Sequence, residues 1–215
     1  MDQGLLAIAA ALPETPLEEL ADWPLGRRNS TLAALHSSSF GPRLQGWLSC
    51  GQCGEKLEFE LDARSVAKQR DLEPISAEPI VIGKHTFRLP TSRDVASVAL
   101  EKDSLLAAVH LLESCWLGTG EPPTWSEGDI EEVGERMAAA DPMAETRIML
   151  KCPACGNKCD RTLDFPSFLW GEIEASARRL LAEIHILSSA YGWTEREILS
   201  LSEPRRFLYV EMVRA

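Results

Sequence analysis

Four cysteines are the residues in this sequence whose type and spacing are best suited to chemistry. They form two Cys-x-x-Cys pairs, Cys50 with Cys53 and Cys152 with Cys155, and each pair is followed directly by a glycine. Two thiolates separated by two residues can bind one metal ion from a tight turn, and two such pairs supply the four sulfur ligands of a tetrahedral zinc site. Because four thiolates leave no coordination position for water, the sequence predicts a structural zinc ion without a catalytic role.

The residues around the two pairs repeat. Residues 48–62 align with residues 150–164 without a gap, so that Lys56 falls on Lys158. In the first copy apolar residues alternate with acidic ones from position 57 to position 62, which is typical of a half-buried strand. Each copy therefore predicts a strand, a metal-binding turn and a second strand. Closing the 98-residue connection between the pairs costs about 4 kcal/mol, which is less than the roughly 10–16 kcal/mol that zinc contributes in finger peptides.

A redox dithiol and a disulfide are the alternative uses of a Cys-x-x-Cys pair. Neither pair has thioredoxin-like surroundings, and the first residues of the chain carry no secretory signal pattern, so reduced thiols are expected. Cys115 ends an apolar helical stretch and Cys159 takes the place of Leu57 in the second copy, so both are expected to be buried as small apolar residues. The four histidines have no ligand-like spacing to a cysteine pair and are interpreted as structural: His36, His85, His110 and His185.

Composition and charge restrict the function further. The 215 residues are 45% hydrophobic, which is enough for a substantial core. The net charge is −11 and the isoelectric point is near 4.9, whereas a zinc ribbon that binds nucleic acid needs a basic surface to displace counterions from phosphates. The composition therefore argues against nucleic acid. No apolar run approaches the length of a membrane span, and a cytoplasmic protein without membrane partners is expected.

The predicted elements place the cysteine turns at the ends of short strands. Residues 1–43 read as a helical segment divided by prolines, residues 44–164 as a zinc-ribbon-like β region, and residues 165–215 as a C-terminal helical segment. The β region contains a predicted hairpin at residues 79–89 and a helical insertion at about residues 91–141, where Thr91 and Asp94 suit a helix start. The expected fold class is α+β, with one small antiparallel sheet closed by the cysteine turns and surrounded by helices in one integrated domain.

The C-terminal segment has the clearest periodicity. Apolar residues recur at spacings of three and four from residue 169 to residue 187 after a possible cap at Asp164, and Thr194 with Glu197 forms a capping box for the next turn. The last predicted helix, residues 203–213, carries apolar side chains almost all the way round its axis. Such a helix is either sandwiched inside the domain or docked on another protein. The candidate partner-binding residues are Trp193, Phe207, Tyr209, Val210 and Val213.

A series of short motifs runs along almost the whole chain. In order they are GRRN at 26–29, FGPRL at 40–44, the first cysteine pair, FRLPTSRD at 87–94, the second cysteine pair, FLWGEIE at 168–174, AYGWTEREIL at 190–199 and RRFLY at 205–209. This series resembles bacterial proteins grouped with the T-even-type baseplate hub assembly chaperones. The resemblance implies a role among contractile phage tails and related injection machines, with baseplate hub or spike proteins as partners.

The function implied by this resemblance is that of a non-enzymatic assembly factor, a chaperone for the baseplate hub. The residues agree with a protein that is not an enzyme, because the sequence has no glycine-rich phosphate loop, no GxSxG and no HExxH. Two other classes stay open: a permanent structural subunit of the baseplate, and a zinc-ribbon module that binds nucleic acid. The resemblance also leaves open the identity of the partner, the oligomeric state, and whether the system is a phage or a domesticated derivative.

Overall fold

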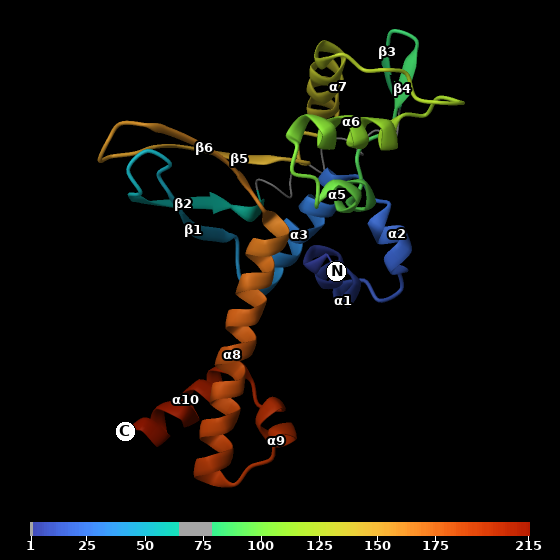
Figure 1. Ribbon diagram of the computed structural model, residues 1–215. Coiled ribbons are helices and arrows are strands. Elements are labelled where there is room, and N and C mark those ends of the chain that lie inside the picture. Colours follow the sequence, from blue (N-terminus) through green and yellow to red (C-terminus); the bar gives the residue numbers. More distant parts are fainter. Residues whose placement is uncertain (1, 65–78) are drawn as a thin grey trace. The chain divides into compact units, whose positions relative to one another are not determined.

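The computed structural model describes residues 2–64 and 79–215 and divides the chain into two compact units, residues 1–169 and residues 170–215 (Figure 1). The first unit holds the N-terminal helices, all the described strands and the helical insertion. The second holds most of one long helix and two shorter ones. The boundary falls five residues after the predicted start of the C-terminal segment at residue 165. Residues 65–78, inside the predicted β region, lie outside the described residues.

Three helices begin the first unit: α1 (Gln3–Ala11), α2 (Leu17–Ala21) and α3 (Leu25–Ser39). Prolines precede α2 and α3 as their N-caps, as expected from residues that end one helix and start the next. The Asp2 side chain caps α1 by accepting from the Gly4 N–H at 2.8 Å, and it forms an ion pair with Arg28 of α3 at 3.0 Å. The apolar core of these helices is fully buried and consists of Ile8, Leu20, Leu32 and Ala33.

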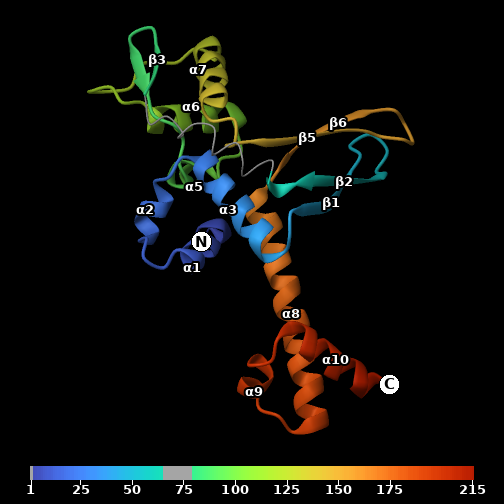
Figure 2. The ribbon, with the colours of Figure 1, turned by 180° about the vertical axis from the view of Figure 1, so that it is seen from behind.

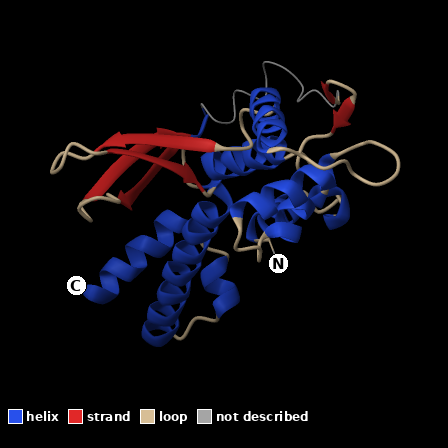
Figure 3. Ribbon diagram, turned by 45° about the horizontal axis from the view of Figure 1, so that its top comes forward, coloured by secondary structure: helices blue, strands red, loops and turns tan. Residues whose placement is uncertain are grey.

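The described strands form three separate antiparallel hairpins (Figure 3). These are β1 (Arg43–Ser49) with β2 (Lys56–Asp62), β3 (Ile80–Ile82) with β4 (His85–Phe87), and β5 (Thr146–Lys151) with β6 (Lys158–Leu163). The expectation of one small sheet is therefore wrong for the described residues. The two cysteine hairpins meet through their turns and side chains, and no ladder of backbone hydrogen bonds joins their strands.

The predicted repeat is visible in the strand registers. Ser49 pairs with Lys56 at the end of the first cysteine hairpin, and Lys151 pairs with Lys158 at the end of the second. Inward positions carry the buried residues Leu44 and Leu57 in one hairpin and Ile148 and Cys159 in the other. The alternation in sequence thus gives each hairpin one apolar face, as period-two patterning requires.

The insertion between the cysteine hairpins consists of the hairpin β3–β4 and three helices. These are α5 (Ser92–Val98), α6 (Ser104–Cys115) and α7 (Glu127–Ala140). The hairpin, α6 and α7 share a core of buried Phe87, Leu112 and Val133, against which Trp116 and Trp125 pack from the segment between the two helices. The predicted helix start at Thr91 and Asp94 is confirmed, and the two residues form a capping box at the start of α5.

A buried aspartate joins the end of the insertion to the N-terminal helices. Asp141, only 2% exposed, accepts a hydrogen bond from the Gly26 N–H in the first turn of α3 at 2.8 Å. Asn29 of the same helix donates to the Met143 carbonyl at 3.0 Å. Burial raises the pKa of Asp141, against the opposing effect of hydrogen bonds from the Gly26 and Met143 backbone N–H groups. Residues more than a hundred positions apart are thereby held together.

Replacing Gly26 with alanine is expected to destabilise the protein by about 1–3 kcal/mol, because the new methyl group would overlap the Asp141 carboxylate and force it from its position. Thermal and urea unfolding measure this change. The matched control is Gly134→Ala in the middle of α7, where a methyl group meets open space, and there a gain of roughly 0.5–1 kcal/mol is expected from helix propensity. Equal unfolding free energies for both variants would contradict the proposed close approach.

The second unit contains α8 (Phe165–Tyr191), which begins in the first unit, followed by α9 (Glu195–Leu199) and α10 (Glu203–Arg214) (Figure 2). The predicted cap of α8 is present, since the Ser167 N–H donates to the Asp164 carboxylate at 3.3 Å. The capping box of Thr194 and Glu197 is also confirmed. One buried residue from each helix forms the core of this unit: Leu187, Ile198 and Val210.

Candidate metal centre

The four predicted ligands lie together at the turns of the two cysteine hairpins. The sulfur atoms of Cys50 and Cys155 are 3.7 Å apart and those of Cys53 and Cys152 are 3.6 Å apart, and all four lie within 4.8 Å of one another. In a tetrahedron with metal–sulfur bonds of about 2.3 Å, neighbouring sulfurs are separated by roughly 3.8 Å. The two close pairs each join one hairpin to the other. This arrangement can hold a metal ion, and the cysteines are free thiols without a disulfide.

The two turns that present the cysteines are nearly identical. In the first, the Cys50 N–H donates to the Glu55 carbonyl at 2.8 Å and the Gly54 N–H donates to the Cys50 carbonyl at 2.9 Å. The second turn has the same bonds with the same lengths, from Cys152 to Asn157 and from Gly156 to Cys152. The sequence repeat is therefore also a structural repeat.

The glycine after each pair has a specific conformational role. Gly54 has φ of +77° and Gly156 has φ of +74°, in the left-handed region that side chains with a Cβ disfavour. This conformation lets the chain reverse directly after the second cysteine of each pair. Both sulfurs of a pair can then face the same point, as a shared metal ion requires.

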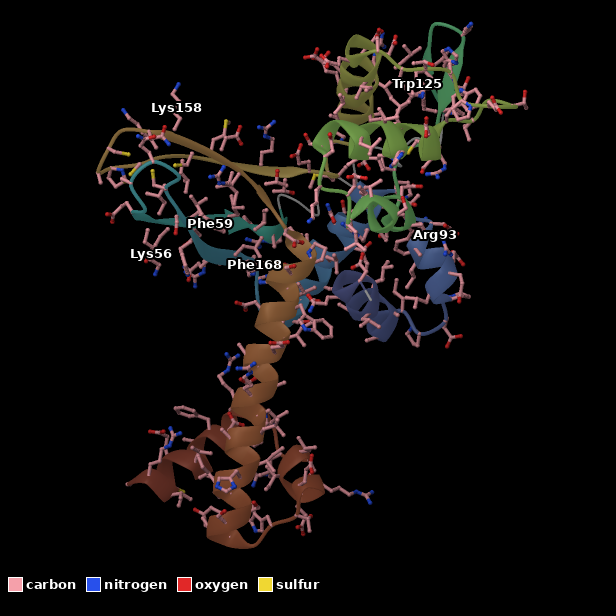
Figure 4. All side chains as sticks on the ribbon, in the orientation of Figure 1. Lys56, Phe59, Arg93, Trp125, Lys158 and Phe168 are labelled. Carbon is pink, nitrogen blue, oxygen red and sulfur yellow. The ribbon has the colours of Figure 1, made fainter. Side chains whose placement is uncertain are left out.

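The cluster of four cysteines has a buried side and an exposed side. Cys50 and Cys152, the first members of the pairs, are buried with Leu57 and Cys159, whereas Cys53 and Cys155 are exposed. Cys159 is 5% exposed at the position where the other hairpin has Leu57, so its expected role as a small apolar residue is confirmed. The lysines that begin the outgoing strands, Lys56 and Lys158, lie near the turns in Figure 4.

Asn157 is a contributor that the sequence analysis missed. Its side-chain nitrogen lies 4.0 Å from the Cys50 sulfur and 3.7 Å from the Cys159 sulfur. An amide donor beside a ligand sulfur orients it and stabilises its thiolate form. The sequence indicates this role only weakly: Asn157 directly follows the glycine of the second copy, at the position where the first copy has Glu55.

The thiols of Cys50, Cys53 and Cys155 do not ionise independently. Backbone N–H groups of Cys53 and Gln52 stabilise the Cys50 thiolate and lower the pKa of Cys50 to about 6, against the effect of burial. For Cys53 the Glu55 backbone N–H also favours the thiolate, but neighbouring thiols and burial outweigh it and raise the pKa to about 12. The pKa of Cys155 is raised as well, in spite of the Asn157 backbone N–H. A thiolate on one cysteine thus disfavours a second thiolate beside it, and a bound cation would remove this repulsion.

Cys115, His36 and His85 are not part of the cysteine cluster. Cys115 is fully buried, and burial raises the pKa of its thiol to about 12. His36 is buried beside Phe40 and Phe168, and His85 lies edge-on to Trp125 with ring centroids 5.0 Å apart. Both serve as packing residues. Among the residues that the structure describes, the cysteine quartet is the one group of three or more potential ligands close enough to share a metal ion.

The candidate partner-binding residues divide into core and surface. Val210 is 4% exposed and belongs to the core of the second unit. Trp193 and Tyr209 are half-buried and interact with each other at 5.0 Å between ring centroids. Phe207 and Val213 are exposed, together with two neighbours that the sequence analysis did not single out, Leu208 and Met212.

Comparisons with known proteins add no relative: no family model, no curated protein and no solved structure matches this chain. The class defined by the fold and the centre is therefore an α+β protein with a four-cysteine cluster able to bind a metal ion. The baseplate family remains an expectation based on sequence motifs. Across the described part of the chain, helices with the length and hydropathy to cross a membrane are absent.

Proposed function

We propose that Cys50, Cys53, Cys152 and Cys155 hold one structural zinc ion. Four sulfur donors at tetrahedral spacing select a soft or borderline metal, and zinc is the usual occupant of such a site without redox chemistry. Carboxylates, which would favour harder cations, are absent from the cluster of described ligands. When bound, the ion supplies charge neutralisation and a rigid link between the two hairpins, while the chain contributes the turn geometry and the Asn157 amide.

The protein that carries this zinc site is proposed to be a non-enzymatic assembly factor for the baseplate hub of a contractile phage tail or a phage-derived injection system. The sequence motifs support its assignment to a contractile tail or injection system. The observation that carries the role of a binding protein is the exposed apolar surface of α10, where Phe207, Leu208 and Met212 are 57%, 61% and 66% exposed. Exposed apolar side chains grouped on one short helix are typical of a surface that another protein covers.

A permanent baseplate subunit would use the same surface, so the proposal is tested by where the protein is found. Quantitative mass spectrometry of purified particles and of the producing lysate separates the possibilities. An assembly factor is expected bound to hub or spike proteins in the lysate and absent from finished particles. Fixed stoichiometry in finished particles would instead establish a structural subunit, and the role as a transient chaperone would be wrong.

The nucleic-acid alternative is tested on the purified protein. Binding to a DNA duplex would weaken steeply with salt if the chain contacted phosphates. We expect no such binding, because the cationic side chains near the second cysteine turn are partly neutralised, as in the bidentate pair of Arg147 with Asp160. Salt-dependent duplex binding at micromolar protein would overturn the assembly role in favour of a nucleic-acid module.

A further inference from the structure

The second unit has a small groove between two of its helices. One wall is a stripe of α8, formed by Arg179, Ala182, Glu183 and Ile186 at helical spacings of three and four, and the other wall is formed by Phe207, Val210 and Arg214 of α10. The groove has a volume of about 200 Å³. Small-molecule sites typically enclose about 300–1,000 Å³. This groove is therefore of a size for side chains from a protein partner and too small for most cofactors.

The floor of the groove is apolar and is held in place by the unit's core. Ile186 and Val210 supply this floor: Val210 is buried with Leu187 and Ile198, and Ile186 packs against the same cluster. Phe207 stands at the edge with more than half of its surface exposed. An aromatic side chain fixed on a helix loses little conformational freedom on binding and is a common anchor in interfaces.

The rim of the groove is cationic, although the chain as a whole is strongly acidic. Glu183 is already neutralised by an ion pair with Arg206 at 2.9 Å, in which both side chains are largely shielded from solvent. Arg179 has no ion-pair partner among the described side chains, and Arg214 has only Glu211, 3.6 Å away and exposed. An exposed pair of this kind contributes little and is easily exchanged. Two guanidinium groups are thus available beside the apolar floor.

We propose that this groove binds an amphipathic helix of a partner protein that presents apolar side chains to the floor and carboxylates to Arg179 and Arg214. Two helical stripes that face each other across an apolar floor match the way in which a helix lies in a groove, with anchors at i, i+3 or i+4, and i+7. The cationic rim selects an acidic helix over a basic one. This inference deepens the proposed function by giving the chemistry of the segment that the hub or spike partner would supply.

The test uses the full chain and a displayed library of 16-residue helical peptides. Selection on the immobilised wild-type protein is expected to enrich peptides with apolar residues at helical spacing and with Asp or Glu beside them. Their affinity is expected to fall at least tenfold for Phe207→Ala and for Arg179→Glu. Leu181→Ala is the matched control: this exposed apolar residue of α8 lies outside the groove lining, and its replacement should leave affinity within about twofold.

Several results would overturn the groove as the docking site. These are enrichment of basic peptides, binding that survives both groove substitutions, loss of binding in the Leu181→Ala control, or failure to enrich any groove-dependent helix. Equilibrium sedimentation checks a second copy of this chain as the occupant: a dimer that dissociates in Phe207→Ala would replace the proposed partner. Phe207 and Arg179 are exposed, so the variants should retain the wild-type circular dichroism spectrum and melting temperature, which must be measured first.

This test is independent of the baseplate. If peptides bind the groove but the protein is not associated with hub proteins in the lysate, the groove is supported as a docking site and the proposed baseplate function is wrong. If the protein does associate with hub proteins and Phe207→Ala leaves that association intact, the proposed function is supported and the groove is not the docking site. Point substitutions are preferable to removal of α10, because deletion would also take Val210 and Tyr209 from the core of the unit.

Discussion

Replacing Cys152 with serine is expected to lower the unfolding free energy by about 4 kcal/mol or more, because it breaks a metal link that closes a connection of nearly one hundred residues. For a protein of this size, that loss corresponds to a decrease of roughly 8–16 °C in melting temperature. Treatment with a strong chelator should have a comparable effect on the wild type and little additional effect on the variant. Elemental analysis of the wild-type protein purified under reducing conditions should find one zinc ion per chain.

The matched control for this prediction is Cys159→Ala. Cys159 is buried in the same cluster as Cys50 and Cys152, but it is outside the quartet. Its replacement should cost about 1 kcal/mol through lost packing and should leave the metal content unchanged. The structural zinc site would be disproved by wild-type protein without stoichiometric metal, or by a Cys152→Ser variant that melts at the wild-type temperature.

Loss of the Asp94 carboxylate is expected to have the second largest effect, about 2–3 kcal/mol for Asp94→Ala. The two terminal nitrogens of the Arg88 guanidinium donate to this carboxylate, at 2.6 and 2.8 Å, and the Thr91 N–H and hydroxyl also donate to it, at 2.8 and 2.7 Å. The Asp94 side chain is 7% exposed. The variant would lose both the ion pair and the cap of α5. The expected cost lies below that of a fully buried pair because the Arg88 side chain is 39% exposed and can be hydrated.

The Asp94 contribution should depend on pH in a defined direction. Burial by itself raises the pKa of Asp94, but the hydrogen bonds from Arg88 and Thr91 outweigh it and hold the pKa below its usual 3.8. A carboxyl group with a lowered pKa in the folded state stabilises the fold above its unfolded-state pKa, and this stability is lost as the pH falls through the folded-state pKa. The difference in unfolding free energy between wild type and Asp94→Ala should therefore be largest near neutral pH and shrink below about pH 4.

Urea unfolding of both proteins across pH 2.5–7 (roughly the range over which carboxyl groups titrate) measures this difference. Arg93→Ala is the control, because Arg93 forms its ion pair with Asp22 on the surface, where both side chains are more than half exposed. An exposed pair contributes about 0–1 kcal/mol. A difference between wild type and Asp94→Ala that stays constant with pH would show that the carboxylate charge does not account for the stabilisation.

Features encoded by neighbouring residues were predictable from the sequence. Both cysteine turns, the helix start at Thr91, the capping box at Thr194 and the replacement of Leu57 by Cys159 were expected and are present. These depend on bonds between residues a few positions apart, or on a ligand spacing that one metal ion imposes. The cysteine quartet is a special case, since the chemistry of the ligands predicted a contact across about one hundred residues without any knowledge of the path between them.

Features that depend on which surfaces meet were decided only by the tertiary structure. The separation of the strands into three hairpins, the contact of Asp141 with Gly26, and the burial of Val210 beside an exposed Phe207 are examples. Sequence periodicity shows that α10 is apolar around its axis, but it does not show which side faces α8 and α9. Local hydrogen bonds and metal ligands are specified by residue type and spacing, whereas burial is specified by the shape of everything that packs around a side chain.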